Sequence, residues 1–164
     1  MLVRDATPGD WPAIWPFMRE IVRAGETFSW DRDLAEPVAR ERWMAGPPVR
    51  TLVAVDGDGD GAVVGTAVTG PNHGGGAAHI ATASFMVDPR HARRGVGRAL
   101  GEAVFAHARA TGFRAMQFNA VVETNVGAVA LWRALGMEIL ATIPEGFRHP
   151  TQGYVGLHIM FGRL

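Results

Sequence analysis

Hydrophobic side chains recur every three or four residues in four stretches of the chain, which is the period of a helix with one buried face. In the first stretch Trp11, Trp15 and Met18 follow this period after Thr7, a residue type that favours a helix start. Gly25 then interrupts the pattern and predicts the end of that helix. The four predicted helices span residues 8–24, 34–44, 96–109 and 125–135.

Seven other stretches are short and either apolar or alternating between apolar and polar residues, as expected of strands. They span residues 2–6, 51–55, 62–69, 78–87, 114–121, 138–143 and 154–161. Between the second and the third, the sequence DGDGDG at residues 56–61 contains Asp-Gly pairs, which favour a hairpin turn. The order of strands and helices predicts one α/β domain that spans residues 1–164.

The composition excludes several kinds of chemistry. The 16 cationic side chains balance 16 carboxylates, so we expect no nucleic acid and no membrane as partner. The chain has no cysteine and no lysine, which excludes a thiol nucleophile, a lysine Schiff base and a Walker-type phosphate loop. No apolar run approaches the ~20 residues of a membrane-spanning helix, and the stretch MLVRDATPGDW lacks the apolar core of a signal peptide. We therefore expect a cytoplasmic protein.

The sequence offers one weak candidate for a metal site. Asp56, Asp58, Asp60 and Gly61 fit the start of a calcium-binding loop. That loop needs a bidentate glutamate at its twelfth position, which is Ala67 here, so a hairpin turn is the favoured interpretation. The six histidines show no metal-binding spacing such as H-x-x-x-H, and we expect no metal.

The stretch HARRGVGRAL, residues 91–100, places two glycines where the third predicted helix begins, shortly after an apolar strand. A helix N-terminus exposes unpaired N–H groups and carries a partial positive charge. Gly95 and Gly97 have no Cβ atoms to keep a phosphate away from these donors. Three arginines add positive charge there: Arg93, Arg94 and Arg98. The pattern predicts a pyrophosphate site, with an arginine cluster that binds no ligand as the alternative.

The same glycines fit a dinucleotide-binding turn poorly. Such a turn has the pattern G-x-G-x-x-G and an acidic residue about 20 positions further on. Here the third glycine falls one position late, at Gly101, and the residue 20 positions after Gly97 is Gln117. A nucleotide-binding protein therefore remains only as a weak functional hypothesis.

Two stretches together resemble the GCN5-related N-acetyltransferase (GNAT) family. They are FMVDPRHARRGVGRAL at residues 85–100 and NVGAVALWRALGM at residues 125–137. In that family a strand leads into Arg/Gln-x-x-Gly-x-Gly/Ala, and Asn-x-x-Ala-x-x-Leu-Tyr-x-x-x-Gly-Phe follows one helix and one strand later. The resemblance implies a single-domain α/β fold, with a mixed, mostly antiparallel sheet of about seven strands flanked by about four helices. It also implies an acetyl-CoA-dependent N-acetyltransferase, and homodimers are common among similar proteins.

The resemblance assigns residues to acetyl-CoA. The backbone of Phe85, Met86 and Val87 would bind the pantetheine arm, and Asn125 would lie near the thioester end. The pyrophosphate would be held by the backbone N–H groups of Arg93, Arg94, Gly95, Val96, Gly97 and Arg98.

The chain departs from the family pattern at two positions. Ala92 stands at the Arg/Gln position, and Trp132 replaces the tyrosine that often protonates the leaving thiolate. An indole N–H donates hydrogen bonds but does not release its proton at neutral pH. Trp132 therefore suggests either that another group supplies the proton or that the protein is a non-catalytic acyl-CoA-binding module. Simple packing on the buried side of its helix is the structural alternative for this residue.

The stretches HIATASFMVDP and FNAVVETN, at residues 79–89 and 118–125, resemble the fungal L-azetidine-2-carboxylate (proline-analogue) N-acetyltransferases. This similarity implies a small amine or amino acid as acceptor. Asn119 would hold the acceptor, and Thr82 stands where those enzymes have another acceptor-side asparagine. Phe28 and Trp30, between the first two helices, either line the acceptor pocket or belong to the core.

Strand geometry gives a separate expectation for Asn119. Alternation places Asn119 and Val121 on one face of the strand and Phe118 and Ala120 on the other. An amide among apolar residues needs hydrogen-bond partners, which would be the acceptor or backbone groups where two strands separate.

The implied reaction is a direct transfer, in which a neutral amine attacks the acetyl thioester. The N–H of Val87 would stabilise the resulting oxyanion, and a base must deprotonate the amine. Glu123 is the predicted base because it lies between a strand and Asn125, with Glu26 and His79 as further candidates. The alternative for Glu123 is a solvated carboxylate near a helix start.

Overall fold

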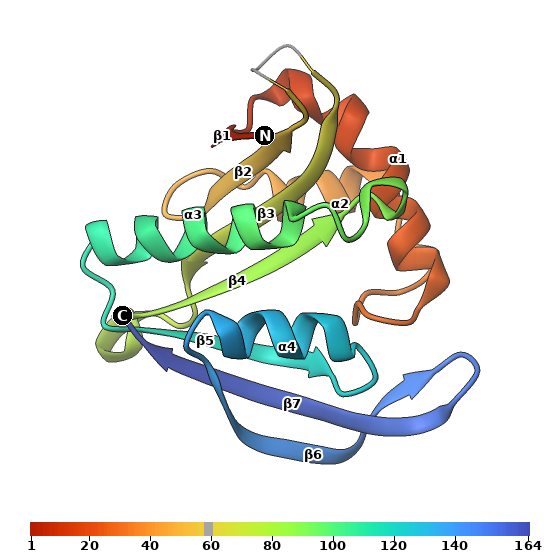
Figure 1. Cartoon of the computed structure of the whole chain (residues 1–164), viewed down its shortest axis with the longest axis vertical. Coiled ribbons are helices and arrows are strands. Elements are labelled where there is room, and N and C mark those ends of the chain that lie inside the picture. Colours follow the sequence, from red (N-terminus) through yellow and green to blue (C-terminus); the bar gives the residue numbers. More distant parts are fainter. Residues whose placement is uncertain (58–60) are drawn as a thin grey trace.

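All strands of the computed structural model, which describes residues 1–57 and 61–164, belong to one sheet (Figure 1). Their order within these residues is β1-β2-β3-β4-β5-β7-β6. The strands are β1 (Leu2–Asp5), β2 (Arg50–Val55), β3 (Val63–Pro71), β4 (Ile80–Val87), β5 (Ala115–Val122), β6 (Glu138–His149) and β7 (Gly153–Arg163). All neighbouring pairs are antiparallel except β4 and β5, which are parallel. The expected mixed, mostly antiparallel seven-stranded sheet is therefore confirmed.

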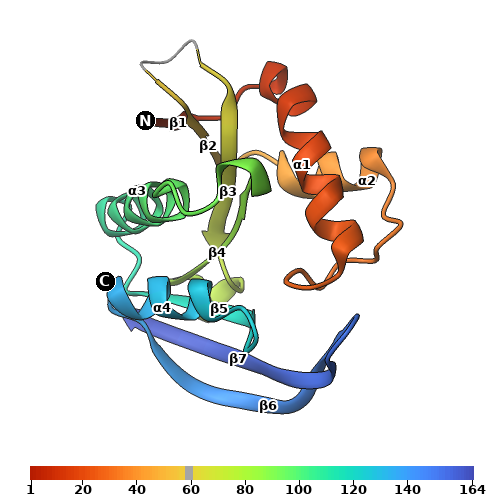
Figure 2. The same ribbon diagram turned by 45° about the vertical axis from the view of Figure 1, so that its right-hand side comes forward.

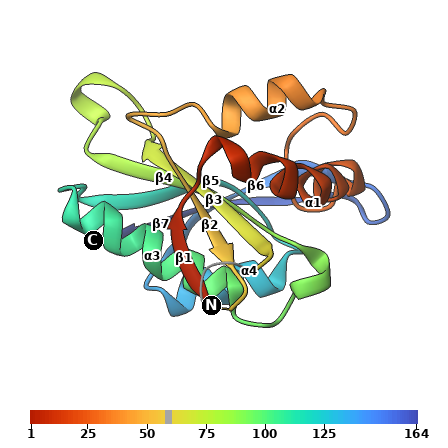
Figure 3. The same ribbon diagram turned by 90° about the horizontal axis from the view of Figure 1, so that it is seen from above.

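Four α-helices in the described part of the chain cover the two faces of the sheet. They are α1 (Trp11–Ala24), α2 (Glu36–Trp43), α3 (Val96–Ala110) and α4 (Val126–Ala134). Figure 2 shows α1 and α2 on one side of β2 and β3 and α3 on the other, and Figure 3 shows the same layers from above. None of these helices is long and apolar enough to cross a membrane.

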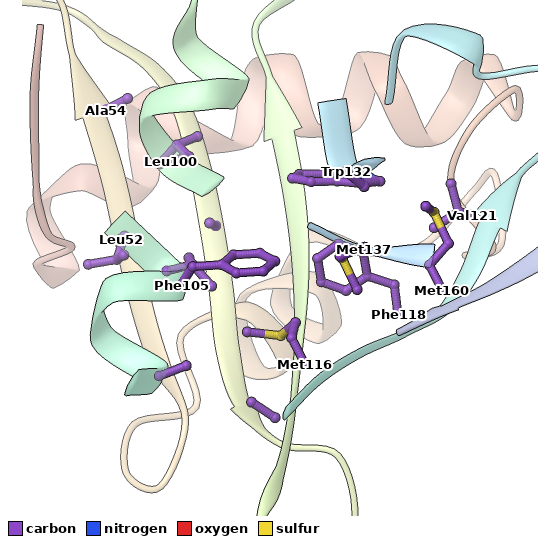
Figure 4. Close-up of a cluster of buried hydrophobic side chains, with 14 of the residues drawn as sticks. Leu52, Ala54, Leu100, Phe105, Met116, Phe118, Val121, Trp132, Met137 and Met160 are labelled. Atoms are coloured by element: carbon purple, nitrogen blue, oxygen red, sulfur yellow. The ribbon is translucent and has the colours of Figure 1, made fainter. Parts of the chain in front are cut away.

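Each face of the sheet carries its own hydrophobic core. Alternation along β2 sends Leu52 towards α3 and Val53 towards α1, and both side chains are buried. The core under α3 and α4 includes Leu100, Phe118 and Trp132, which Figure 4 shows as members of one buried cluster. The face under α3 and α4 and the face under α1 and α2 therefore carry separate hydrophobic clusters.

Local signals place the helix ends close to the predicted positions. Gly25 has φ +67° and its N–H donates to the carbonyl of Val22, so the left-handed conformation that glycine adopts readily ends α1 as predicted. At the start, residues Pro8–Asp10 form a 3-10 turn before α1 begins at Trp11.

The last two strands are longer than predicted. The sequence PEG at residues 144–146 suggests that a strand ends at Ile143, but β6 continues to His149. The pairing with β7 shifts between Ile143 and Phe147, and Glu145 has φ +54°. This irregularity is a β-bulge on an edge strand, where a proline removes no ladder hydrogen bond that the sheet needs.

The predicted turn and the weak calcium-loop pattern at residues 56–61 include residues 58–60, which lie outside the described residues. Among the described residues, no three His, Asp or Glu side chains lie close enough together to hold a metal ion.

Candidate acetyl-transfer site

The sheet opens between its two parallel strands. β4 and β5 are paired only at Ile80–Ala115 and Ala81–Met116, although each strand is eight residues long. Beyond these pairs the two strands diverge, as Figure 1 shows, while β4 stays paired with β3 up to Val87. The second half of β4 therefore has one edge that no neighbouring strand covers.

The backbone of β4 presents hydrogen-bonding groups at this uncovered edge. The N–H of Asp88 donates to the carbonyl of Val64 in β3 at 2.9 Å. Because successive N–H groups of a strand point to opposite edges, the N–H groups of Val87 and Phe85 point into the opening. The N–H of Met86 points to β3, and its side chain is buried against α1. The prediction that Met86 binds the pantetheine arm together with Phe85 and Val87 is therefore not supported, since its backbone is engaged on the other side.

A pocket of about 210 Å³ occupies the opening. Its lining comes from both faces of the sheet, because it includes the α1–α2 connection as well as α4. The lining residues are Thr27, Phe28, Ser29, Trp30, Thr82, Ala83, Ser84, Phe85, Phe118, Asn119, Ala120, Val121, Val122, Asn125, Ala128 and Trp132. None of these described residues has a side chain that is charged near neutral pH. The pocket therefore has a lining without charged side chains.

The wall on the α4 side is aromatic. The ring of Trp132 lies 4.5 Å from that of Phe85 and 4.9 Å from that of Phe118, measured between centroids. Figure 4 shows the Trp132 ring above Phe118 in this cluster. Trp132 is only 6% exposed, so the packing role considered for it is observed, and its ring also lines the pocket.

The wall on the α1 and α2 side combines aromatic and polar groups. Phe28 and Trp30 pack edge-to-face at 5.2 Å, and Trp30 packs at 5.8 Å against the buried Trp43. Both residues line the pocket and also pack against the core, and contact with the acceptor stays a prediction. Alternation along β4 places Thr82 and Ser84 on this same face.

The start of α3 has the geometry of an anion site. Gly95 precedes the helix with φ +83°, and a Cβ there would meet no atom within 4 Å. The first N–H bonded within the helix is that of Ala99, to the carbonyl of Gly95. The preceding N–H groups, those of Val96, Gly97 and Arg98, are therefore available to a ligand.

Side chains and backbone strain shape the same turn. Arg93 has φ +63°, a conformation that costs about 1 kcal/mol or more for a residue other than glycine and is common at ligand sites. Arg94 lies 3.9 Å from Asp56 and Arg98 lies 3.4 Å from Glu102, measured between guanidinium nitrogens and carboxylate oxygens.

Packing within the chain does not by itself require a glycine at position 97. A Cβ there would lie 3.4 Å from Leu131 and 3.8 Å from Val87, which are ordinary van der Waals distances. The approach of a phosphate is therefore the remaining reason for Gly97.

Known proteins resemble this chain in sequence and in fold. The sequence pattern of the Acetyltransferase (GNAT) family matches residues 15–137. The chain belongs to this family. The structure of a GCN5-related N-acetyltransferase from Kribbella flavida is 55% identical, covers 99% of this chain and 97% of its own, and has a TM-score of 0.94.

Two further relatives are more distant. A phosphinothricin acetyltransferase of the GNAT superfamily from Sinorhizobium meliloti, in complex with AcCoA, is 25% identical with a TM-score of 0.87 and covers 99% of this chain and 88% of its own. The N-acetyltransferase aca1 of Schizosaccharomyces pombe is 31% identical over 113 residues, which is 68% of this chain. The chain spans 54% of the length of that yeast protein.

In this GNAT protein Asn125 begins α4. Its side-chain oxygen accepts a hydrogen bond from the N–H of Ala128 at 3.3 Å, so the residue caps the helix. Asn125 also lines the pocket, and its Nδ2 group is not used by this cap. A contact with the thioester end of acetyl-CoA is compatible with that position.

Asn119 lines the pocket, but the strand geometry predicted for it is wrong. The pairing of β5 with β7 shifts between Phe118 and Val121, and these two residues are both buried while Asn119 and Ala120 are exposed. A bulge breaks the alternation and turns Asn119 outward. Asn119 bonds side chains rather than the backbone. Its Nδ2 donates to Asn72 at 2.7 Å, and Gln117 donates to its Oδ1 at 2.8 Å.

The three predicted bases lie outside the pocket lining. The carboxylate of Glu123 lies over Gly156 of β7 and beside Thr142, and the residue is exposed. Glu26 and His79 are exposed as well. Sequence proximity to Asn125 did not predict the direction of the Glu123 side chain, because that direction depends on β7.

Sequence reasoning missed two residues that shape the site. Ser84 lines the pocket beside Thr82, and the polar pair T-x-S within an apolar strand was a usable signal for it. Asp88 is 1% exposed and accepts hydrogen bonds from the N–H and the guanidinium of Arg90, which lower the pKa of Asp88 below its usual value. This carboxylate fixes the turn between β4 and α3.

Proposed function

We propose that this GNAT protein is an acetyl-CoA-dependent N-acetyltransferase that acts directly on the amine of a small molecule or amino acid, proline analogues included. One observation carries the proposal. The pocket at the β4–β5 opening is lined from both faces of the sheet, so a donor from the α3–α4 side can meet an acceptor from the α1–α2 side. The names of the relatives from Sinorhizobium meliloti and Schizosaccharomyces pombe support the same reaction class.

The residues of the chain fit acetyl-CoA. The N–H of Phe85 and the carbonyl groups of Phe85 and Val87, at the uncovered edge of β4, would hold the pantetheine arm. The free N–H groups at the start of α3 would hold the pyrophosphate, beside Arg93 and Arg94. Acetyl-CoA would supply an activated acetyl thioester at the aromatic wall.

The N–H of Val87 would stabilise the negative charge that develops on the carbonyl oxygen during the attack, since it is directed to the uncovered edge of β4. Trp132 would contribute shape and exclude water, because its buried indole is not a proton donor at neutral pH. The proton for the leaving thiolate would therefore come from water or from the attacking amine.

The neutral lining also decides how the amine loses its proton. Because no carboxylate or imidazole of the described residues lines the pocket, we propose that water removes this proton and that Glu123 stays a solvated carboxylate. The rate would then follow the ionisation of the acceptor amine itself.

The acceptor would lie on the α1–α2 side, between the aromatic pair Phe28 and Trp30 and the polar groups of Thr82 and Asn119. Asn119 keeps one N–H of its amide beyond the bond to Asn72, and this group would contact the acceptor.

The deciding experiment measures free thiol release from acetyl-CoA with a panel of amines and amino acids, and detects the acetylated product by mass spectrometry. The proposal expects turnover with at least one acceptor. Tight acetyl-CoA binding by calorimetry without any turnover would favour the acyl-CoA-binding module. Thermal stabilisation by NAD or ATP but not by acetyl-CoA would favour the nucleotide-binding protein. The homodimer stays a prediction, which light scattering of the purified chain would test.

A further inference from the structure

A second cavity lies beside the acceptor side of the opening. Its volume is about 130 Å³, and it shares three consecutive residues of β4, Thr82, Ala83 and Ser84, with the pocket described above. Its remaining lining residues are Arg42, Val49, Val68, Thr69, Gly70 and Pro71. A ligand that reaches Thr82 and Ser84 from the main pocket is therefore next to this cavity.

Arg42, in the last turn of α2, brings a positive charge to the place where the two cavities meet. It lines the second cavity, and its guanidinium carbon lies 5.8 Å from the centroid of the Trp30 ring, which lines the first. Stacking on an aromatic ring orients a guanidinium while its N–H groups stay available. The ion pairs formed within the described residues do not include Arg42.

Arg42 differs in charge from the other residues that line the two cavities. Among the described residues that line either cavity, Arg42 is the one with a charged side chain. A neutral pocket with one arginine at its border disfavours a second cation and favours an anion, because guanidinium binds carboxylates through two parallel hydrogen bonds.

The network around Asn119 points to the same place. Asn72, which exchanges two hydrogen bonds with Asn119, directly follows Pro71 of the second cavity. The amide of Asn119 and the charge of Arg42 thus lie along neighbouring parts of one polar border.

We infer that Arg42 binds an anionic group of the acceptor, so that the preferred acceptors are amines that also carry a carboxylate. The inference rests on the proposed acetyltransferase function and specifies its substrate class. Arg42 acts as a specificity residue, because it would touch the acceptor away from the reacting amine.

The test compares acceptors matched in shape, with kcat/KM expressed per concentration of neutral amine, because a carboxamide makes the neighbouring amine less basic than a carboxylate does. Acetyl transfer is measured with the standard L-amino acids and L-azetidine-2-carboxylate, each against its own carboxamide. The wild-type chain should prefer the carboxylates in kcat/KM by about tenfold or more, the usual range for a charge-assisted hydrogen bond. Arg42→Met, which keeps the apolar stem, should lose this preference through a fall in kcat/KM for the carboxylates, and Arg42→Lys should retain part of it.

Arg40→Met is the matched control, because Arg40 lies on the same helix and lines a different cavity. It should leave both classes of acceptor unaffected. The melting temperature and the acetyl-CoA Kd of each variant report on folding and on the donor site. Equal rates with carboxylates and carboxamides in the wild type, or a full preference in Arg42→Met, would overturn the inference and leave the acetyltransferase intact. Absence of turnover with every acceptor would overturn both.

Discussion

Phe85 of β4 and Trp132 of α4 lie with their ring centroids 4.5 Å apart across the wall of the opening in the sheet. Two elements that are distant in sequence are joined here, because the side chain of Phe85 projects from the face of β4 that α4 covers and packs in the same core as Trp132. Trp132, which stands where the resemblance implies a tyrosine, is therefore a buried packing residue in this chain.

Replacing Trp132 tests this packing role. Trp132→Ala should lower the free energy of unfolding by about 3–5 kcal/mol, because it leaves a cavity among Phe85, Phe118 and α3. Chemical denaturation measures the change. Leu140→Ala, at a residue that is 59% exposed, is the control and should change stability by less than about 0.5 kcal/mol. A small effect at Trp132 would contradict the packing role.

A single methyl group added at Gly95, in the turn before α3, should weaken the binding of acetyl-CoA. Gly95→Ala forces a residue with a Cβ into φ +83°, which costs about 1–2 kcal/mol, and it places the Cβ in the open space where the pyrophosphate would approach. The acetyl-CoA Kd from calorimetry should rise severalfold or more. Gly112→Ala is matched, since Gly112 also has φ +83° with open space around it but follows the far end of α3. An equal loss of affinity in both variants would remove Gly95 from the cofactor site.

Replacing Asn119, whose side chain is turned outward and lines the pocket, should affect the acceptor and not acetyl-CoA. Asn119→Ala should raise the acceptor KM by about 2- to 10-fold, the range for one neutral hydrogen bond, and leave the acetyl-CoA Kd unchanged. Gln117→Ala removes a bond to the same Oδ1 without touching the pocket lining and should have a smaller effect. Steady-state kinetics with both substrates varied provide the comparison, and unaltered acceptor kinetics in Asn119→Ala would exclude the contact.

The dependence of kcat/KM on pH should not depend on Glu123. Because its carboxylate lies over Gly156 and outside the pocket, Glu123→Gln should leave the rise of kcat/KM towards alkaline pH unchanged. The midpoint of that rise should instead move with the pKa of the acceptor amine when acceptors of different basicity are compared. Loss of the rise in kcat/KM with pH in Glu123→Gln would instead show that Glu123 is the base.

Local sequence signals determined the order and most boundaries of the elements. Gly25 and Gly95 each adopt a left-handed backbone conformation at a helix end, and the helical period from Trp11 onwards reports the face that α1 buries. These features depend on residues a few positions apart, so the helix ends and the buried helix face can be predicted from the sequence without knowing the fold. For the same reason the family motifs at residues 85–100 and 125–137 were visible in the sequence.

Only the tertiary structure decided where the site is and which groups face it. The separation of β4 from β5, the bulge that turns Asn119 outward, and the continuation of β6 past Pro144 depend on the pairing of strands that are far apart in the chain. Arg42 meets Trp30 through the packing of α2, and Glu123 is directed away by β7. Such contacts form between segments that are far apart in the sequence, and the periodicity within one segment does not specify how it packs against another. The sequence therefore predicted the helices and strands, whereas the positions of the side chains around the opening depend on the tertiary structure.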